Sequence, residues 1–214
     1  MKHLALAAAL LFTVASVAAA GPAMLTTDPH VYPVTAKHRV HLEFPVGELR
    51  VIPTNGSKVE LLIRVKCRGR SEERCEELAN ELVLRSDDRD GLLHLKLEDY
   101  PKWHSRGFSV HAELHMPRQL PLELDMGVGE LDIAGLEGEL DVDLGVGDAD
   151  IRTTRSTTGH VMVETGVGDA SIRGADGEAQ RSGFIGSHAS WRAGSGKSTV
   201  RLHVGVGDAT VRLD

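Results

Sequence analysis

Gly145-Val146-Gly147-Asp148-Ala149-Asp150-Ile151-Arg152 is the stretch that decides the fold of this 214-residue chain. Similar units occur three more times, and the second glycines of the four units are Gly129, Gly147, Gly168 and Gly207. These glycines lie 18, 21 and 39 residues apart. Because 39 is the sum of 18 and 21, the long step predicts one further, degenerate unit around Gly186. A period of about 18–21 residues is typical of a solenoid, in which each repeat stacks on its neighbours.

Each unit has the pattern of a strand that turns a corner. Before Gly147, apolar residues alternate with polar ones from Leu140 to Val146, which is typical of a half-buried strand. After Gly147 the apolar positions are Ala149 and Ile151, so the alternation has slipped by one residue. We therefore expect a bend or bulge at a glycine. The same slip occurs further upstream, and the expected corner glycines are Gly47, Gly129, Gly147, Gly168, Gly186 and Gly207.

The chain divides into four parts around these units. Residues 1–20 have a basic start, an apolar run and a small-residue cleavage site, which predicts a secretory signal peptide. Residues 21–37 contain several prolines and no period, and we expect a loose arm. Residues 38–116 are predicted to form a β-rich cap with one short helix at 71–84, where Ser71 suits an N-cap. Residues 117–214 hold the regular repeats, so we expect an all-β solenoid forming one domain with its cap.

Composition narrows the class of partner. Removal of residues 1–20 leaves 23 basic and 31 acidic residues, which argues against nucleic acid as a partner. Aromatic residues are 4% of the chain, too few for an extended sugar-stacking platform. Cys67 and Cys75 are the only cysteines, and in an exported chain such a pair predicts a disulfide. We expect no membrane span once the signal peptide is removed.

An acidic residue follows every expected corner glycine except Gly186. The residues that could form a cation- or ligand-binding ladder are Glu130, Asp148, Asp150, Asp169 and Asp208. Like charges one strand apart repel by only about 0.9 kcal/mol in water, so a ladder of this kind does not require a cation. Calcium β-rolls have glycine pairs at a nine-residue period, which this chain lacks. The main expectation is that the aspartates accept backbone N–H groups at the corners, with calcium as an alternative and no other cofactor.

Two histidines lie on one face of a predicted strand, at His111 and His115. They would share a metal only if the strand bends, with His41 or His94 of other strands as further ligands, and a solvated strand face is the main expectation. We find no nucleophile–base–orienter set and no Gly-x-Ser-x-Gly elbow, so we expect no enzymatic activity. A polysaccharide-active β-solenoid enzyme with stacked acids remains an alternative.

The run from His38 to Asp214, with Val46-Gly47-Glu48-Leu49-Arg50-Val51 near its start, resembles the bacterial "putative-adhesin" domain family of unknown function. The helical insertion with Cys67 and Cys75 is similar to a subgroup of that family. The resemblance implies an exported β-solenoid at the periplasm or cell surface and no catalytic residues. We therefore expect an adhesin-like binding or scaffold protein whose partner is an envelope protein or a surface glycan. An exposed last coil ending at Asp214 would also allow end-to-end self-association.

Overall fold

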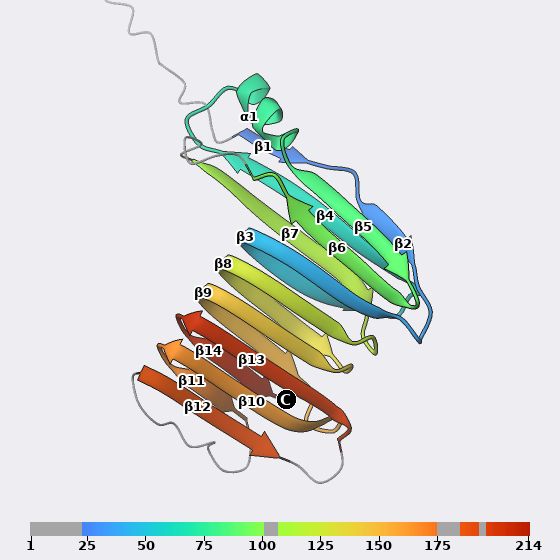
Figure 1. Ribbon diagram of the computed structural model, residues 1–214, viewed down its shortest axis with the longest axis vertical. Helices are drawn as coiled ribbons and strands as arrows, with labels where there is room; N and C mark the ends of the chain where they lie inside the picture. Colours follow the sequence, from blue (N-terminus) through green and yellow to red (C-terminus); the bar gives the residue numbers. More distant parts are fainter. Residues whose placement is uncertain (1–22, 101–106, 175–184, 193–195) are drawn as a thin grey trace, which may run out of the picture.

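The computed structural model describes residues 23–100, 107–174, 185–192 and 196–214, so the signal peptide expected at 1–20 lies outside the described residues. The fold is all-β with one short helix, as the sequence predicts (Figure 1). The strands of the N-terminal part are β1 (Ala23–Thr26), β2 (His30–Pro33), β3 (Arg39–Thr54), β4 (Lys58–Cys67), β5 (Val83–Arg89), β6 (Leu92–Glu98) and β7 (Phe108–Pro117). The strands of the repeat part are β8 (Leu122–Leu136), β9 (Leu140–Thr153), β10 (Thr158–Val167), β11 (Ala170–Arg173), β12 (Ile185–Arg192), β13 (Ser198–Val206) and β14 (Ala209–Leu213).

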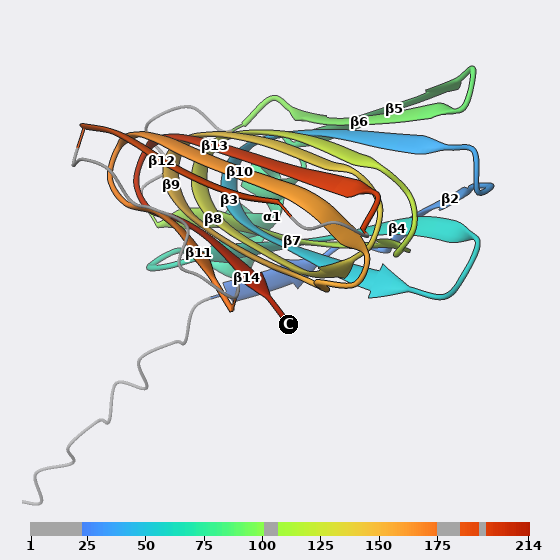
Figure 2. The same cartoon turned by 90° about the horizontal axis from the view of Figure 1, so that it is seen from below.

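The strands form two layers (Figure 2), and the main hydrophobic core lies between them. The three longest strands, β3, β8 and β9, bend near their middle and contribute one half to each layer. Layer 1 contains β5, β6, the first halves of β3, β8 and β9, and then β13, β10 and β12. Layer 2 contains β1 and β2, then β4, β7, the second halves of β3, β8 and β9, and then β14 and β11.

The core is built by the alternation that the sequence shows. Leu42, Leu124 and Val142 point inward from layer 1, and Val51 and Ile133 point inward from layer 2, each at most 1% exposed. Strands β3, β8 and β9 are parallel and in register, so their equivalent apolar residues form continuous columns through the interior. Burial of these columns is the main favourable contribution to the stability of the fold.

The bend occurs at the glycine pairs. Gly47, Gly129 and Gly147 lie side by side on β3, β8 and β9, with φ between 141° and 146°. A Cβ atom on Gly147 would come 1.8 Å from the carbonyl oxygen of Gly129, so no larger residue fits without a shift of the backbone. The expected roles of Gly168 and Gly207 agree with their φ values of 134° and 135° and similarly close contacts.

The first glycine of each pair is also crowded, although less than the second, which we did not expect. A Cβ atom on Gly145 would lie 2.6 Å from the carbonyl oxygen of Gly127, although no positive φ constrains it. The sequence carries a signal for this, since both glycines of the pair recur in every unit. The first glycines of the repeat part are Gly127, Gly145, Gly166 and Gly205.

The valine between the two glycines points outward, contrary to the expected inward alternation. Val128, Val146 and Val206 are 47%, 47% and 48% exposed, while Leu144 is fully buried. The slip in alternation therefore begins one residue earlier than the pattern indicates, because the whole Gly-Val-Gly segment forms the corner.

The coils do not stack in the order of the sequence, which corrects a second expectation. In Figure 1 the red β13 and β14 lie between β9 and the orange β10 and β11, and the pairing of β13 with β9 and β10 places them there. The segment ending at Asp214 is thus interior and is not the exposed last coil that we expected. The unit predicted at Gly186 is also wrong, because β12 runs antiparallel to β10 and Gly186 has a φ of 69° with open space around it.

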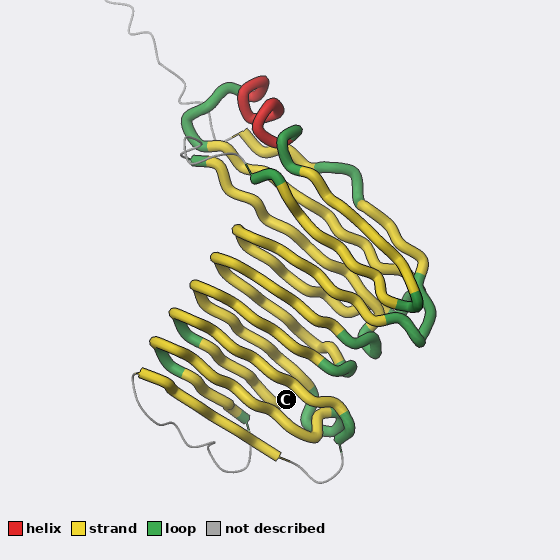
Figure 3. Tube along the Cα trace, viewed as in Figure 1, coloured by secondary structure: helices red, strands yellow, loops and turns green. Residues whose placement is uncertain are grey.

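The N-terminal part contains more strand and less helix than predicted. Residues expected to be a loose arm form β1 and β2, which pair with the edge of β4, where a proline at a strand end is tolerated. The segment after the helix, whose first residues were expected to be helical, forms the mostly exposed strand β5. The helix α1 covers only Glu72–Ala79, with the Ser71 side chain accepting from the N–H of Arg74 as expected (red in Figure 3).

The predicted disulfide is confirmed: it joins Cys67 at the end of β4 to Cys75 of α1, and both residues are fully buried.

Candidate functional site

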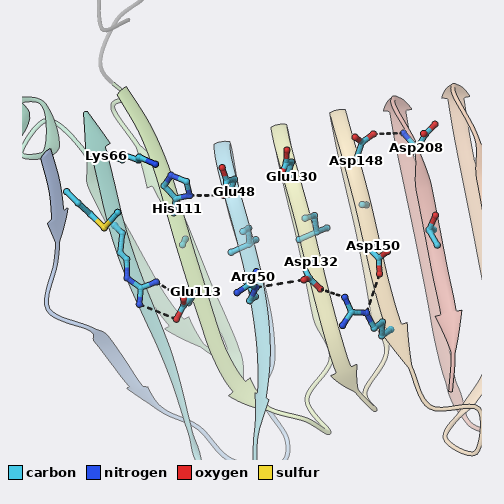
Figure 4. Close-up of a pocket in the computed structure, with 18 residues that line it drawn as sticks. Glu48, Arg50, Lys66, His111, Glu113, Glu130, Asp132, Asp148, Asp150 and Asp208 are labelled. Atoms are coloured by element: carbon cyan, nitrogen blue, oxygen red, sulfur yellow. Dashed lines mark hydrogen bonds and ion pairs between the residues drawn. The ribbon is translucent and has the colours of Figure 1, made fainter. Parts of the chain in front are cut away.

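A groove of about 880 Å³ runs across the outer face of layer 2. Its lining comes from β1, β4, β7, β3, β8, β9 and β14, so it crosses strands from both the cap and the repeats (Figure 4). The side chains on this face follow the corner glycines, since the alternation after each corner sends Leu49, Leu131 and Ala149 inward and their neighbours outward. The groove is therefore a direct product of the repeat.

A row of carboxylates, one from each neighbouring coil, runs along one side of the groove, and all of its members except Asp169 line the groove. We call Glu48, Glu130, Asp148, Asp208 and Asp169 the carboxylate row. Asp148 Oδ1 accepts the backbone N–H of Asp208 at 2.9 Å, and Asp208 Oδ1 accepts that of Asp169 at 2.9 Å. Figure 4 shows the first of these bonds. The geometry agrees with the expectation that aspartates act at the corners, and each bond reaches the adjacent coil. The expectation of calcium stays a prediction.

We expect Asp148→Ala to destabilise the chain by about 1 kcal/mol, because the substitution removes the acceptor of the Asp208 N–H. The melting temperature would fall by about 2–4 °C. Glu130→Ala is the matched control: it removes the same charge from the row, and within the described residues its carboxylate accepts no backbone N–H. Equal melting temperatures of the two variants would contradict the structural role of Asp148.

A second row of charged groups lies beside the first and is internally paired. Asp150 Oδ2 lies 2.6 Å from Arg212 Nη2, and Asp132 Oδ2 lies 3.8 Å from Arg50 Nε. Arg152 bridges the two aspartates, at 3.6 Å from Asp150 and 3.8 Å from Asp132. Asp150, which the sequence places in the possible cation ladder, therefore forms ion pairs with arginines.

The cap forms the other end of the groove. Arg64 of β4 donates to Glu113 of β7 at 2.5 Å, and this bond lowers the pKa of the Glu113 carboxyl, with a smaller contribution in the same direction from His115. His111 Nδ1 lies 2.8 Å from Glu48 Oε2, which connects the cap to the carboxylate row. Lys66 also lines this end, so the groove changes from acidic over the repeats to mixed charge over the cap.

The histidines that might have shared a metal are separated by the two layers. His111 and His115 lie on the outer face of layer 2, each beside a different glutamate. His41 and His94 lie in layer 1. They therefore do not share a metal site with His111, contrary to the alternative that the sequence left open. Within the described residues, the only histidine-containing group with donor atoms close enough for one metal ion is His41, Glu43 and His94.

With this geometry established, the comparisons place the chain in a family. The model of the N-terminal domain of toast_rack, DUF2154, matches residues 28–173, well over half of the chain. The chain belongs to the toast_rack N-terminal domain family. The family match ends inside the repeat part, at the end of β11, so β12, β13 and β14 of this toast_rack chain lie beyond it.

Solved structures give weaker likenesses to this toast_rack chain. A "putative cell adhesion protein" from Clostridium sporogenes is 14% identical with a TM-score of 0.48, over 91% of this chain and 100% of that one. A "putative adhesin" from Parabacteroides merdae is 12% identical with a TM-score of 0.33, over 63% of this chain and 54% of that one. A third, from Bacteroides fragilis, is 10% identical with a TM-score of 0.29, over 88% and 96%.

No curated protein matches this toast_rack chain. Among the residues that the structure describes, no helix has the length and apolarity needed to cross a membrane.

Proposed function

We propose that the chain is a non-enzymatic, adhesin-like β-solenoid, exported to the periplasm or the cell surface, that binds an envelope protein through the groove of layer 2. The observation that carries this proposal is the carboxylate row, four of whose five acidic side chains line one groove and come from four adjacent coils. A regular row with strand spacing suits an extended partner that carries positive charges.

Export is supported by the disulfide between Cys67 and Cys75. Such a bond persists in oxidising compartments and is rare in the cytosol. It holds α1 to the end of β4 next to the groove, so it keeps the cap in place while the repeats engage a partner.

Binding fits the groove better than catalysis does. Asp148 and Asp208 are used as backbone acceptors, and Asp132 and Asp150 are paired with arginines. A general acid or base needs a proton-transfer group that is free to meet the substrate. These contacts support a structural and binding role for the acidic side chains of both rows.

A protein partner fits better than a glycan. The described residues that line the groove include no phenylalanine, tyrosine or tryptophan, the side chains on which sugars usually stack. Acidic side chains at regular spacing instead complement lysine and arginine side chains.

The test is retention of envelope proteins, solubilised from the bacterium that encodes the chain, on the immobilised oxidised chain. Glu130→Lys places a positive charge in the middle of the row and should reduce retention at least tenfold at physiological salt. A tenfold loss corresponds to about 1.4 kcal/mol, the size expected of one reversed charge at close range.

Glu164→Lys is the control, because Glu164 lies on the outer face of layer 1 and its reversal leaves the groove unchanged. Equal retention by the two variants would contradict the proposed site. Turnover of a polysaccharide that is abolished by Asp148→Asn would overturn the non-enzymatic assignment.

A further inference from the structure

We propose that His41, Glu43 and His94 bind one divalent transition-metal ion of the zinc class on the outer face of layer 1. This site lies on the opposite layer from the groove and does not depend on the function proposed for it. Three strands build it: β3 supplies His41 and Glu43, β6 supplies His94, and β8 supplies the neighbouring Asp125.

The register of the parallel strands brings the two histidines together. His41 of β3 lies directly opposite His94 of β6, and their rings stack with centroids 4.6 Å apart and an interplanar angle of 15°. Glu43 lies two residues beyond His41 on the same face, and its Oε1 lies 2.9 Å from His94 Nε2. The fold thus places two imidazoles and a carboxylate in one cluster, although His94 is at least 51 residues from the other two along the chain.

The donor atoms are close to the spacing that a metal requires. One donor atom from each of the three residues lies within 4.8 Å of the others. In a tetrahedral zinc site with bonds of about 2.0–2.1 Å, the donors are roughly 3.3 Å apart. Side-chain rotation alone can close this difference, because the side chains of His41 and His94 are 20% and 34% exposed and are not locked in the core. The same exposure gives an ion access from solvent.

Asp125 is placed as the positioning residue of the site. Its Oδ2 lies 2.8 Å from His41 Nε2. Histidine ligands of metals usually donate their second ring N–H to a carboxylate, which fixes the tautomer and the orientation of the ring. Two imidazoles and one carboxylate leave a coordination position open for water, as in zinc sites with three protein ligands.

The surrounding charge favours a cation despite one lysine. Lys96 Nζ lies 3.0 Å from Glu43 Oε2 and would oppose an incoming ion. It also lies 3.5 Å from Glu98 and can move to that partner. Asp87 of β5 lies opposite His94, and Glu123 of β8 lies opposite His41, so carboxylates flank the cluster on both sides.

The same face offers a matched control. His203 Nδ1 lies 2.9 Å from Asp143 Oδ1, a histidine–carboxylate pair like that of His41 and Asp125. Within the described residues it belongs to no group of three donor atoms. His203→Gln therefore removes one exposed histidine from layer 1 and leaves the proposed site unchanged.

The experiment is a calorimetric titration of the oxidised, EDTA-treated and desalted chain with zinc chloride. We expect one tight equivalent of zinc. His94→Gln and Glu43→Gln should each weaken zinc binding at least tenfold, while His203→Gln should bind like the unchanged chain. Copper(II) should bind more tightly than zinc, following the usual order of divalent ions, and magnesium should not compete. Circular dichroism of each variant checks that it is folded.

A second measurement does not depend on variants. In the NMR spectrum of the unchanged chain, zinc should shift the ring resonances of His41 and His94 before those of His203. Binding that is equally weakened by His203→Gln, or unaffected by His94→Gln, would overturn the proposal. So would the absence of zinc binding at micromolar concentrations, or early shifts at other histidines.

Discussion

Gly147→Ala is expected to lower the free energy of unfolding by several kcal/mol. The alanine Cβ would lie 1.8 Å from the carbonyl oxygen of Gly129, and the φ of 141° is one that L-residues with a side chain rarely adopt. The neighbour that must move is backbone, held on both sides by parallel strands, so the corner cannot relax alone. The melting temperature should fall by about 10 °C, since 1 kcal/mol corresponds to about 2–4 °C for a chain of this size.

Thermal denaturation followed by circular dichroism measures this effect. Gly56→Ala is the control, because its Cβ would meet only Thr54 Oγ1 at 3.9 Å and the residue lies in a turn. A fall in melting temperature no larger for Gly147→Ala than for Gly56→Ala would contradict the corner geometry.

Deletion of residues 198–214 is expected to abolish cooperative folding of the repeat part. This segment forms β13 and β14, which lie between β9 and the coil of β10 and β11. Its loss removes six core residues: Val200, Leu202, Val204, Ala209, Val211 and Leu213. It also removes the strands that link β9 to the coil of β10 and β11, since these make no strand pairing with each other in the described part of the chain. We expect a large loss of β signal in circular dichroism and rapid proteolysis between β9 and β12.

A chain that lacks residues 21–33 is the matched control for this deletion. It loses β1 and β2, which lie at an edge of layer 2 beside β4, so only one strand is uncovered. We expect this control to stay folded with a lowered melting temperature. If the C-terminal deletion were tolerated equally well, β10 would have to re-pair with β9, and the interior position of β13 would not be essential.

Local features of the fold could be predicted from the sequence because they depend on short-range patterns. The alternation of Leu140 and Val142 indicates a strand with one buried face, and the slip at Gly147 indicates the corner. The spatial order of the coils could not be predicted in this way. Val200, Leu202 and Val204 have the same pattern as Leu140, Val142 and Leu144. Because the units share one pattern, the sequence of a unit does not specify which other unit it stacks on.

The errors in the cap have a similar physical origin. Strand β5 is polar and exposed on nearly all of its length, so it lacks the apolar alternation by which strands are recognised. Strands β1 and β2 form because β4 offers an unpaired edge, and an edge is a property of the folded sheet that no local pattern reports.

The candidate sites were predictable to different degrees. The carboxylate row follows from counting residues after each glycine, and parallel register then aligns Glu48, Glu130 and Asp148. The groove also needs Arg64 and Glu113, which enter through antiparallel pairing of β4 with β7 that the sequence does not fix. The cluster of His41 with His94 depends on one register between β3 and β6, and a shift by a single residue would separate the rings to opposite faces.

The interior position of β13 and β14 also bears on when the chain can fold. These strands follow β10 and β11 in the sequence and are therefore synthesised after them, yet they pair with both and separate them from β9. The repeat part therefore cannot assemble coil by coil from its N-terminus during synthesis, as a simple stack would. Chains cut short before residue 198 would remain substrates for proteases, so the fold itself distinguishes chains that contain β13 and β14 from chains that lack them.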